Sequence, residues 1–223
     1  MRKDGELGRD KRRVAIVIYS QYGQTLKIAN AIEKAIESGG ELAEVFEVDR
    51  RGRVPLLRFP DYHGFIVGAP IYAGKVPARL IRWLRENMHV IGKYQNALFT
   101  VSLSAASKTE KSIRENERLL HQLEIDTGMK PELTSTFAGA VNYREYGFLL
   151  RWIMKRICRS EGGPTDTSRD HELTDWTEVN AFAQEFLQRL TQENQLSAVA
   201  SEATILTFGD GGETRPAPIR PGS

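Results

Sequence analysis

The chain contains the apolar run Val14-Ala15-Ile16-Val17-Ile18-Tyr19, followed at once by the polar loop Ser20-Gln21-Tyr22-Gly23-Gln24-Thr25. A continuous apolar run of this length is typical of a buried parallel strand. Helical periodicity begins directly after the loop, so the loop should lead into a helix N-terminus, where unpaired backbone N–H groups and the helix dipole favour an anion. The six loop residues therefore predict a phosphate site, although an ordinary strand-to-helix turn with a Ser or Thr cap has the same local pattern.

Length and composition limit the class of protein. The 223 residues are 40% hydrophobic and 27% charged, which suits one domain of about 150–190 residues with tails. The net charge of +2 gives no global basic field, so we expect no nucleic-acid partner. A single cysteine, Cys158, and four scattered histidines predict neither disulfides nor a metal site and fit a reducing cytoplasm. The sequence also lacks a signal-peptide pattern and an apolar run of about 18 residues, so we expect no membrane span.

Five apolar runs of strand length alternate with segments of helical periodicity. The runs are residues 14–19, 43–48, 64–69, 97–103 and 136–141, and the predicted helices are 25–38, 77–88, 109–127 and one that begins near 176. The crossover between 48 and 64 is short and rich in Arg and Pro, which fits a loop as well as a helix. This alternation predicts an α/β fold with a doubly wound, five-stranded parallel sheet of order 2-1-3-4-5.

Apolar spacing along the helices predicts which side chains face the core. In the third helix the inward residues should be Ile113, Leu119, Leu120 and Leu123. Asp175 and Glu178 form a capping-box pattern at the start of the last helix. The apolar residues of that helix repeat at helical spacing and are expected in the core: Trp176, Val179, Phe182, Ala183, Phe186, Leu187 and Leu190.

The domain is expected to cover residues 13–192. Residues 1–12 form a polar N-terminal extension. Residues 193–223 turn to Ser, Thr, Gly and Pro with few large apolar groups, which predicts a disordered tail.

Three loops should meet where the strands end, beside the switch point between the first and third strands. The first loop lacks both the lysine of a triphosphate loop and the three-glycine dinucleotide fingerprint, so a monophosphate is the simpler ligand. The second loop offers small residues and one aromatic ring to a flat ligand, and the third offers backbone N–H groups and hydroxyls to a polar ring edge. Each could be a plain connection, but together they predict an FMN site made by Ser20, Gln21, Tyr22, Gly23, Gln24, Thr25, Pro70, Ile71, Tyr72, Ala73, Gly74, Ser102, Leu103, Ser104 and Ala105.

These residues resemble the flavodoxin superfamily, whose phosphate loop reads Ser/Thr-x-Thr-Gly-x-Thr. Ser20, Gly23 and Thr25 match this pattern, and Tyr22 replaces the central threonine. Within the superfamily the chain is similar to the menaquinone-dependent protoporphyrinogen dehydrogenases over about residues 13–192. That resemblance is carried by residues 20–25, 137–141, 151–155, 162–167 and 174–176. It implies FMN-dependent oxidation of protoporphyrinogen IX to protoporphyrin IX in haem biosynthesis, with a membrane quinone as acceptor.

An insertion, about residues 143–174, separates the fifth strand from the last helix. Read as a helix, its first half places cations on one side and apolar residues on the other. Such a helix suits an anionic membrane surface or an anionic substrate, but it also suits packing on its own domain with a solvated basic face. The resemblance makes Arg144, Arg151, Trp152 and Lys155 candidates for contact with substrate carboxylates or lipid phosphates. It also implies peripheral attachment at the cytoplasmic face of the membrane.

Two other functions fit the same cofactor. One is an NAD(P)H:quinone reductase, and the other is an electron carrier without a substrate of its own. A carrier usually presents an acidic face around its flavin, and the basic insertion counts against it. No catalytic acid or base is assigned, because Asp166 and Asp175 are more simply read as helix caps than as catalytic carboxylates.

Overall fold

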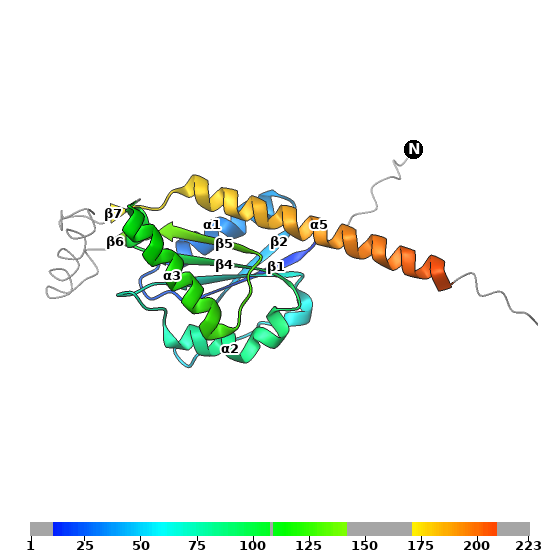
Figure 1. The fold of residues 1–223 in the computed structure, drawn as a ribbon, viewed down its shortest axis with the longest axis horizontal. Coiled ribbons are helices and arrows are strands. Elements are labelled where there is room, and N and C mark those ends of the chain that lie inside the picture. Colours follow the sequence, from blue (N-terminus) through cyan, green and yellow to red (C-terminus); the bar gives the residue numbers. More distant parts are fainter. Residues whose placement is uncertain (1–10, 108, 142–170, 209–223) are drawn as a thin grey trace, which may run out of the picture. The chain divides into compact units, whose positions relative to one another are not determined.

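The computed structural model describes residues 11–107, 109–141 and 171–208 (Figure 1). Its main sheet is parallel and has the order β2-β1-β3-β4-β5, which confirms the predicted fold class. The strands are β1 (Arg13–Ile18), β2 (Leu42–Glu47), β3 (Gly64–Pro70), β4 (Gln95–Ser102) and β5 (Leu133–Ala138). β3 and β4 are buried along their whole length, because helices cover both faces of the sheet.

The helices are α1 (Gln24–Ser38), α2 (Ala78–Ile91), α3 (Glu110–Thr127) and α5 (Trp176–Phe208). Glycines follow the first three, and Pro77 directly precedes α2. The crossover between β2 and β3 is a loop that contains only the short 3₁₀ helix η1 (Phe59–Asp61), and a second such helix, η2 (Ser104–Ala106), follows β4.

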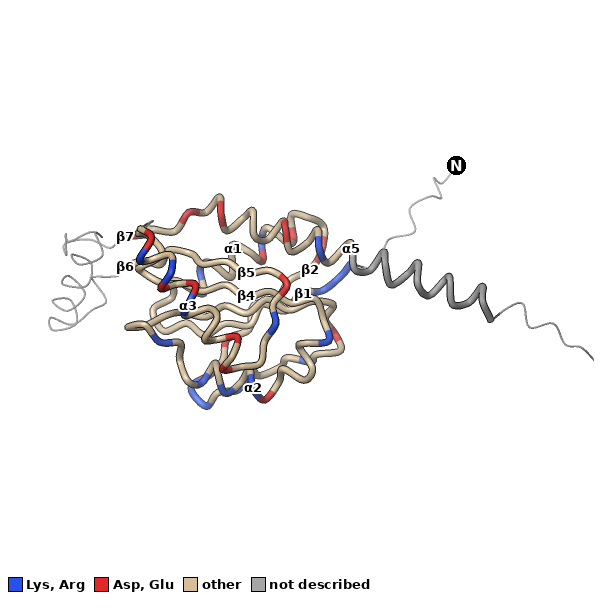
Figure 2. Tube along the Cα trace, viewed as in Figure 1, with Lys and Arg blue, Asp and Glu red and all other residues tan. Residues whose placement is uncertain are grey.

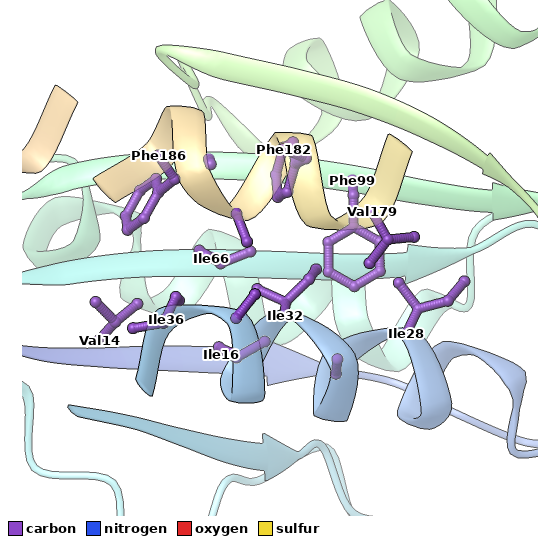
Figure 3. Close-up of a cluster of buried hydrophobic side chains, with 14 of the residues drawn as sticks. Val14, Ile16, Ile28, Ile32, Ile36, Ile66, Phe99, Val179, Phe182 and Phe186 are labelled. Atoms are coloured by element: carbon purple, nitrogen blue, oxygen red, sulfur yellow. The ribbon is translucent and has the colours of Figure 1, made fainter. Parts of the chain in front are cut away.

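Two apolar cores lie on opposite faces of the sheet because successive strand residues alternate. Val14, Ile16 and Ile18 face α1 and α5, where Phe182 and Phe186 complete the cluster drawn in Figure 3. Ala15 and Val17 face α2 and α3 together with the apolar side chains Phe65, Leu80, Trp83, Leu84 and Leu123. The N-termini of α1 and α2 therefore lie on opposite faces of one sheet.

Gly68 shows how closely the first of these cores is packed. A Cβ atom at this position would lie 2.4 Å from Phe99 Cζ and 2.7 Å from Ile18 Cγ2. Two large side chains thus fill the space beside β3, and any side chain at residue 68 would force them apart.

A buried ion pair closes the amino edge of the sheet, where the strands begin. Arg12 is 7% exposed, its Nε donates to Glu41 Oε1 at 2.9 Å, and its Nη1 donates to Leu190 O at 2.9 Å. The backbone N–H of Arg12 donates to Glu41 Oε2 at 2.6 Å. This guanidinium thus links the start of β1 to the segment before β2 and to α5, and its hydrogen bonds offset the cost of burying its charge.

A second polar cluster lies at the same edge. Tyr62 Oη donates to Glu44 Oε2 at 3.1 Å, and Arg13 forms an ion pair with Glu44. Burial, together with the bond to Glu44, raises the pKa of Tyr62 to about 12. The phenol therefore stays protonated well above the usual tyrosine range.

Two predicted core residues are exposed. Ile113 is 48% exposed because the buried stripe of α3 runs through Ser112, Asn116, Leu119 and Leu123, one position away from it. Trp176 is 41% exposed because α5 first becomes buried at Val179, one turn later. The prediction that these two residues are inward was wrong, although the rest of the α5 stripe is buried as expected.

The ends of the insertion form a two-stranded antiparallel ribbon of β6 (Ala140–Val141) and β7 (His171–Glu172). The run predicted as one strand over 136–141 is therefore divided at Gly139 between β5 and β6. No helix in the described part of the chain is long and apolar enough to cross a membrane.

The predicted disordered tail was wrong for residues 193–208, which continue α5. This stretch is rich in Ala, Leu and Glu, and no Gly or Pro occurs before Gly209. The chain divides into two compact units, residues 1–190 and 191–223, and only the first carries the sheet and its edges.

Candidate functional site

Loop 1, residues 20–25, lies between the end of β1 and the first turn of α1. Gly23 is the N-cap of α1 and has a φ of 81°, a left-handed conformation that favours glycine. A Cβ atom built at Gly23 meets nothing within 4 Å, so the space beside it is open to a ligand. The N-cap residue Gly23 has no side chain that could cap α1, and the first turn of α1 holds no acidic residue, which favours an added anion at the start of the helix.

The donor set of loop 1 fits the phosphate of FMN. The loop contains no Lys or Arg, so it offers neutral donors: backbone N–H groups and the hydroxyls of Ser20 and Thr25. Ser20 Oγ lies 3.4 Å from the N–H of Leu26 and accepts from it, which fixes this hydroxyl beside the first turn. Thr25 is 2% exposed. Compact neutral donors at a helix N-terminus are suited to a monophosphate.

Gln24 joins loop 1 to the end of the insertion. Its Nε2 donates to Thr174 Oγ1 at 2.8 Å and to Glu172 Oε1 at 3.1 Å, and Thr174 Oγ1 donates to Ala138 O at 2.7 Å. The Gln24 side chain thus connects the start of α1 to β7 through Glu172 and, through Thr174, to the end of β5.

Loop 2, residues 70–76, lies against loop 1. The Tyr72 hydroxyl accepts from the backbone N–H of Gln21 at 3.0 Å, and the Tyr22 and Tyr72 rings meet edge to face at 5.3 Å. Two backbone hydrogen bonds between Tyr72 and Lys75 close a tight turn in which Ala73 and Gly74 have φ angles of 48° and 73°. The structure therefore brings the first two predicted loops together at one edge of the sheet.

Loop 3, described over residues 102–107, is held by a buried side chain of α3. Ser102 Oγ and Ser104 Oγ lie 3.0 and 2.9 Å from Asn116 Oδ1. Ser102 Oγ also accepts from the backbone N–H of Ala105 at 3.1 Å. The two hydroxyls are therefore used to hold the loop in place, and the backbone of the loop is the part available to a ligand.

Sequence reasoning missed three residues that position these loops: Asn116, Glu172 and Thr174. The signal for Asn116 was present, because a polar residue stands on the helix face that is otherwise apolar at Leu119 and Leu123. Glu172 and Thr174 had no signal of that kind, since their contact with Gln24 spans about 150 positions.

The predicted substrate or membrane contacts, Arg144, Arg151, Trp152 and Lys155, lie outside the described residues, as do Cys158 and Asp166. Asp175 Oδ1 accepts from the backbone N–H groups of Thr177 at 2.9 Å and Glu178 at 3.4 Å, which confirms its role as a helix cap. Within residues 11–107, 109–141 and 171–208, no group of three His, Cys, Asp or Glu side chains is placed to hold a metal ion.

Fold and site together define a protein of the class that binds FMN at the switch point of a 2-1-3-4-5 sheet. The chain belongs to the flavodoxin domain family, whose model matches residues 15–168. This assignment confirms FMN as the predicted cofactor.

Similar proteins confirm the resemblance to protoporphyrinogen dehydrogenases that was predicted from the sequence. The chain is 25% identical over 173 residues to the protoporphyrinogen IX dehydrogenase (quinone) of Escherichia coli strain K12, covering 78% of this chain and 93% of that protein. It is 29% identical over 126 residues to a Leishmania major protein of the same name, covering 56% of this chain and 54% of that protein. Among solved structures, oxidised flavodoxin 1 from Bacillus cereus aligns with a TM-score of 0.45 at 15% identity, covering 79% of this chain and 97% of that one.

Proposed function

We propose that this protein is an FMN-dependent oxidoreductase that oxidises protoporphyrinogen IX to protoporphyrin IX and passes the electrons to a quinone such as menaquinone. The open, uncharged N-terminus of α1 at Gly23 carries the cofactor part of this proposal. The names of the relatives in Escherichia coli and Leishmania major support the substrate and the acceptor. The overall reaction removes six electrons and six protons from the porphyrinogen and reduces three quinones to quinols.

Bound FMN would supply the two-electron redox chemistry. The chain would supply binding and orientation: Ser20, Gly23 and Thr25 would hold the phosphate at the start of α1. The Tyr72 ring and the backbone of residues 102–105 would hold the flat part of the cofactor. Gln24 would keep the return of the insertion beside the cofactor loop.

An anaerobic assay tests this function. The FMN-loaded protein is mixed with protoporphyrinogen IX, and porphyrin fluorescence is followed before and after addition of a quinone. Fluorescence should rise only after the quinone is added, and NADPH should be consumed at a negligible rate. Fast NADPH-driven quinone reduction would instead identify a quinone reductase, and no reaction with either donor would leave an electron carrier.

We also propose that the protein attaches peripherally to an anionic membrane surface at the cytoplasmic face, through the basic side of the insertion. The five Lys and Arg residues between 143 and 159, against one Glu, support this attachment. Arg151→Glu combined with Lys155→Glu should abolish binding to vesicles that contain anionic lipid. Unchanged vesicle binding by this variant would rule the surface out.

A further inference from the structure

A cleft lies between loop 1 and the start of α2, on the sheet face opposite α1. It has a volume of about 470 Å³. Its walls are formed by the end of β1 and loop 1, by loop 2 and by the start of α2: Tyr19, Gln21, Tyr72, Lys75, Val76, Pro77, Ala78 and Arg79. Gln21 and Tyr72 are shared with the residues predicted to bind FMN, whereas the two cations of the cleft, Lys75 and Arg79, are not among those residues.

The cleft is cationic and holds no carboxylate. Lys75 and Arg79 are both exposed, and no carboxylate of the described residues forms an ion pair with either. Arg79 Nη1 lies 3.4 Å from Tyr19 Oη and donates to it, so the guanidinium is held at the wall of the cleft. Two cations that no described carboxylate neutralises, in one concave site, favour an added oxyanion.

The start of α2 adds to this preference. Pro77 supplies no side-chain cap, and the first turn contains no acidic residue. The N–H groups of Leu80 and Ile81 donate to Pro77 O. The described part of the chain offers no acceptor to the N–H groups of Ala78 and Arg79. Ala78 and Arg79 line the same cleft as Lys75, so the positive end of the α2 dipole lies beside that cleft.

The wider surroundings are also basic, as Figure 2 shows along α2. From residue 49 to residue 91 the sequence has eight Lys and Arg against three Asp and Glu. Arg82 Nη2 donates to Arg51 O at 3.1 Å and so holds the basic turn 49–53 against α2. The nearby Asp49 carboxylate accepts from the backbone N–H groups of Arg51 and Arg53, so it is engaged within its own turn.

Apart from Gln21, the other walls of the cleft are apolar or aromatic: Tyr19, Tyr72, Val76, Pro77 and Ala78. The matching ligand carries an oxyanion on an apolar body. We propose that the cleft binds a carboxylate substituent of the electron-donating substrate, through Lys75 and Arg79. This proposal rests on the proposed function, in which the donor is an apolar macrocycle with two propionates.

A titration with the reaction product tests this subsite. The FMN-loaded full chain is titrated with protoporphyrin IX and, separately, with its dimethyl ester, which keeps the apolar body but has no charge. Lys75→Met combined with Arg79→Met keeps the side-chain stems and removes both charges. We expect this variant to bind the diacid about thirtyfold more weakly and the diester as the original protein does.

The matched control is Lys34→Met combined with Lys93→Met, which removes two exposed charges near the opposite edge of the sheet. This control should bind diacid, diester and FMN like the original protein, and FMN affinity, measured by flavin fluorescence, should also be unchanged in the cleft variant. Equal binding of the diacid by both variants would overturn the subsite, as would an equal loss for the diester. Loss of FMN from the cleft variant would also overturn it, because Lys75 and Arg79 would then belong to the cofactor site.

Two further measurements separate this proposal from the proposed function. If inorganic phosphate displaces the diacid less well than acetate does, the cleft prefers a carboxylate; the reverse order would assign it to a phosphate and overturn the proposal. In the turnover assay, an unchanged KM for the porphyrinogen in the cleft variant would overturn the subsite and leave the function standing. Absence of turnover in the original protein would overturn the function, while the diacid titration would still report on the cleft.

Discussion

At the amino edge of the sheet, the Arg12 guanidinium is buried and its donors end on Glu41 and on a carbonyl of α5. At the carboxyl edge, α1 and α2 begin without a side-chain cap, and open space or a cleft lies beside each helix start. The two ends of the same strands thus have different roles, one in stability and one in ligand binding. The hydrogen-bonded Arg12 guanidinium holds the sheet at one edge, and donors left for a ligand make the site at the other.

The largest effect should come from breaking the amino edge. Arg12→Met removes the guanidinium that pairs with the largely buried Glu41 carboxylate and should lower the free energy of unfolding by about 3 kcal/mol. The affinity for FMN, measured by flavin fluorescence on the folded protein, should stay the same. Adding Glu41→Leu should recover much of the stability, because the pair is then replaced by apolar groups. An FMN affinity that falls together with stability would mean that the two edges are not separate.

The next largest effect should appear at the carboxyl edge. Gly23→Val strains a backbone with φ of 81° and places a branched side chain in the space left for the phosphate. The FMN dissociation constant should rise about thirtyfold, or about 2 kcal/mol. Gly40→Val is the matched control, because Gly40 also has a positive φ, 93°, and open space around it, but lies at the other end of α1. Both variants should lose similar stability in urea unfolding, and only the first should lose FMN.

A smaller effect should come from α5, which also begins at the carboxyl edge but has a side-chain cap. Asp175→Ala removes the side chain that caps α5 and should cost about 1 kcal/mol of unfolding free energy, with FMN affinity unchanged. Asp175→Asn should retain most of that stability, since an amide oxygen can accept the same N–H groups. If the alanine variant unfolds at the same urea concentration as the original protein, the cap contributes nothing at this helix start.

The smallest effect should be a pH dependence at the amino edge. The pKa of folded Tyr62 is about 12, against a usual tyrosine value near 10. Between pH 10 and 12 the unfolded chain loses the phenol proton while the folded chain keeps it, so stability falls as the pH rises through this window. Tyr62→Phe should therefore lose less stability than the original protein between these pH values in urea unfolding. Parallel curves for the two proteins would contradict this.

The sheet order was predictable because continuous apolar strands and helical spacing leave few arrangements of an alternating chain. The placement of loops 1 and 2 followed from that order, since parallel strands end at one edge. The contact of Gln24 with Thr174 was not predictable, because it depends on where an insertion of about thirty residues returns. Ile113 was misplaced because apolar spacing alone did not distinguish it from Ser112, whose hydroxyl donates to Thr109 O and takes the buried position.

The Lys75–Arg79 cleft was likewise hidden in the sequence. Its cations are four positions apart, one on each side of Pro77, but the aromatic wall at Tyr19 comes from a distant strand end. Only the fold shows that no carboxylate of the described chain reaches them.

The β6–β7 ribbon brings the two ends of the insertion together, so the insertion can vary independently of the sheet. Ala140 pairs with Glu172 and Val141 with His171, so the chain leaves the domain and re-enters it at neighbouring positions. A segment whose ends already meet can change in length or sequence at little cost to the sheet, because loop-closure entropy grows slowly with length. The segment between β6 and β7 can therefore be replaced while the cofactor loops and the cores beneath them stay as they are.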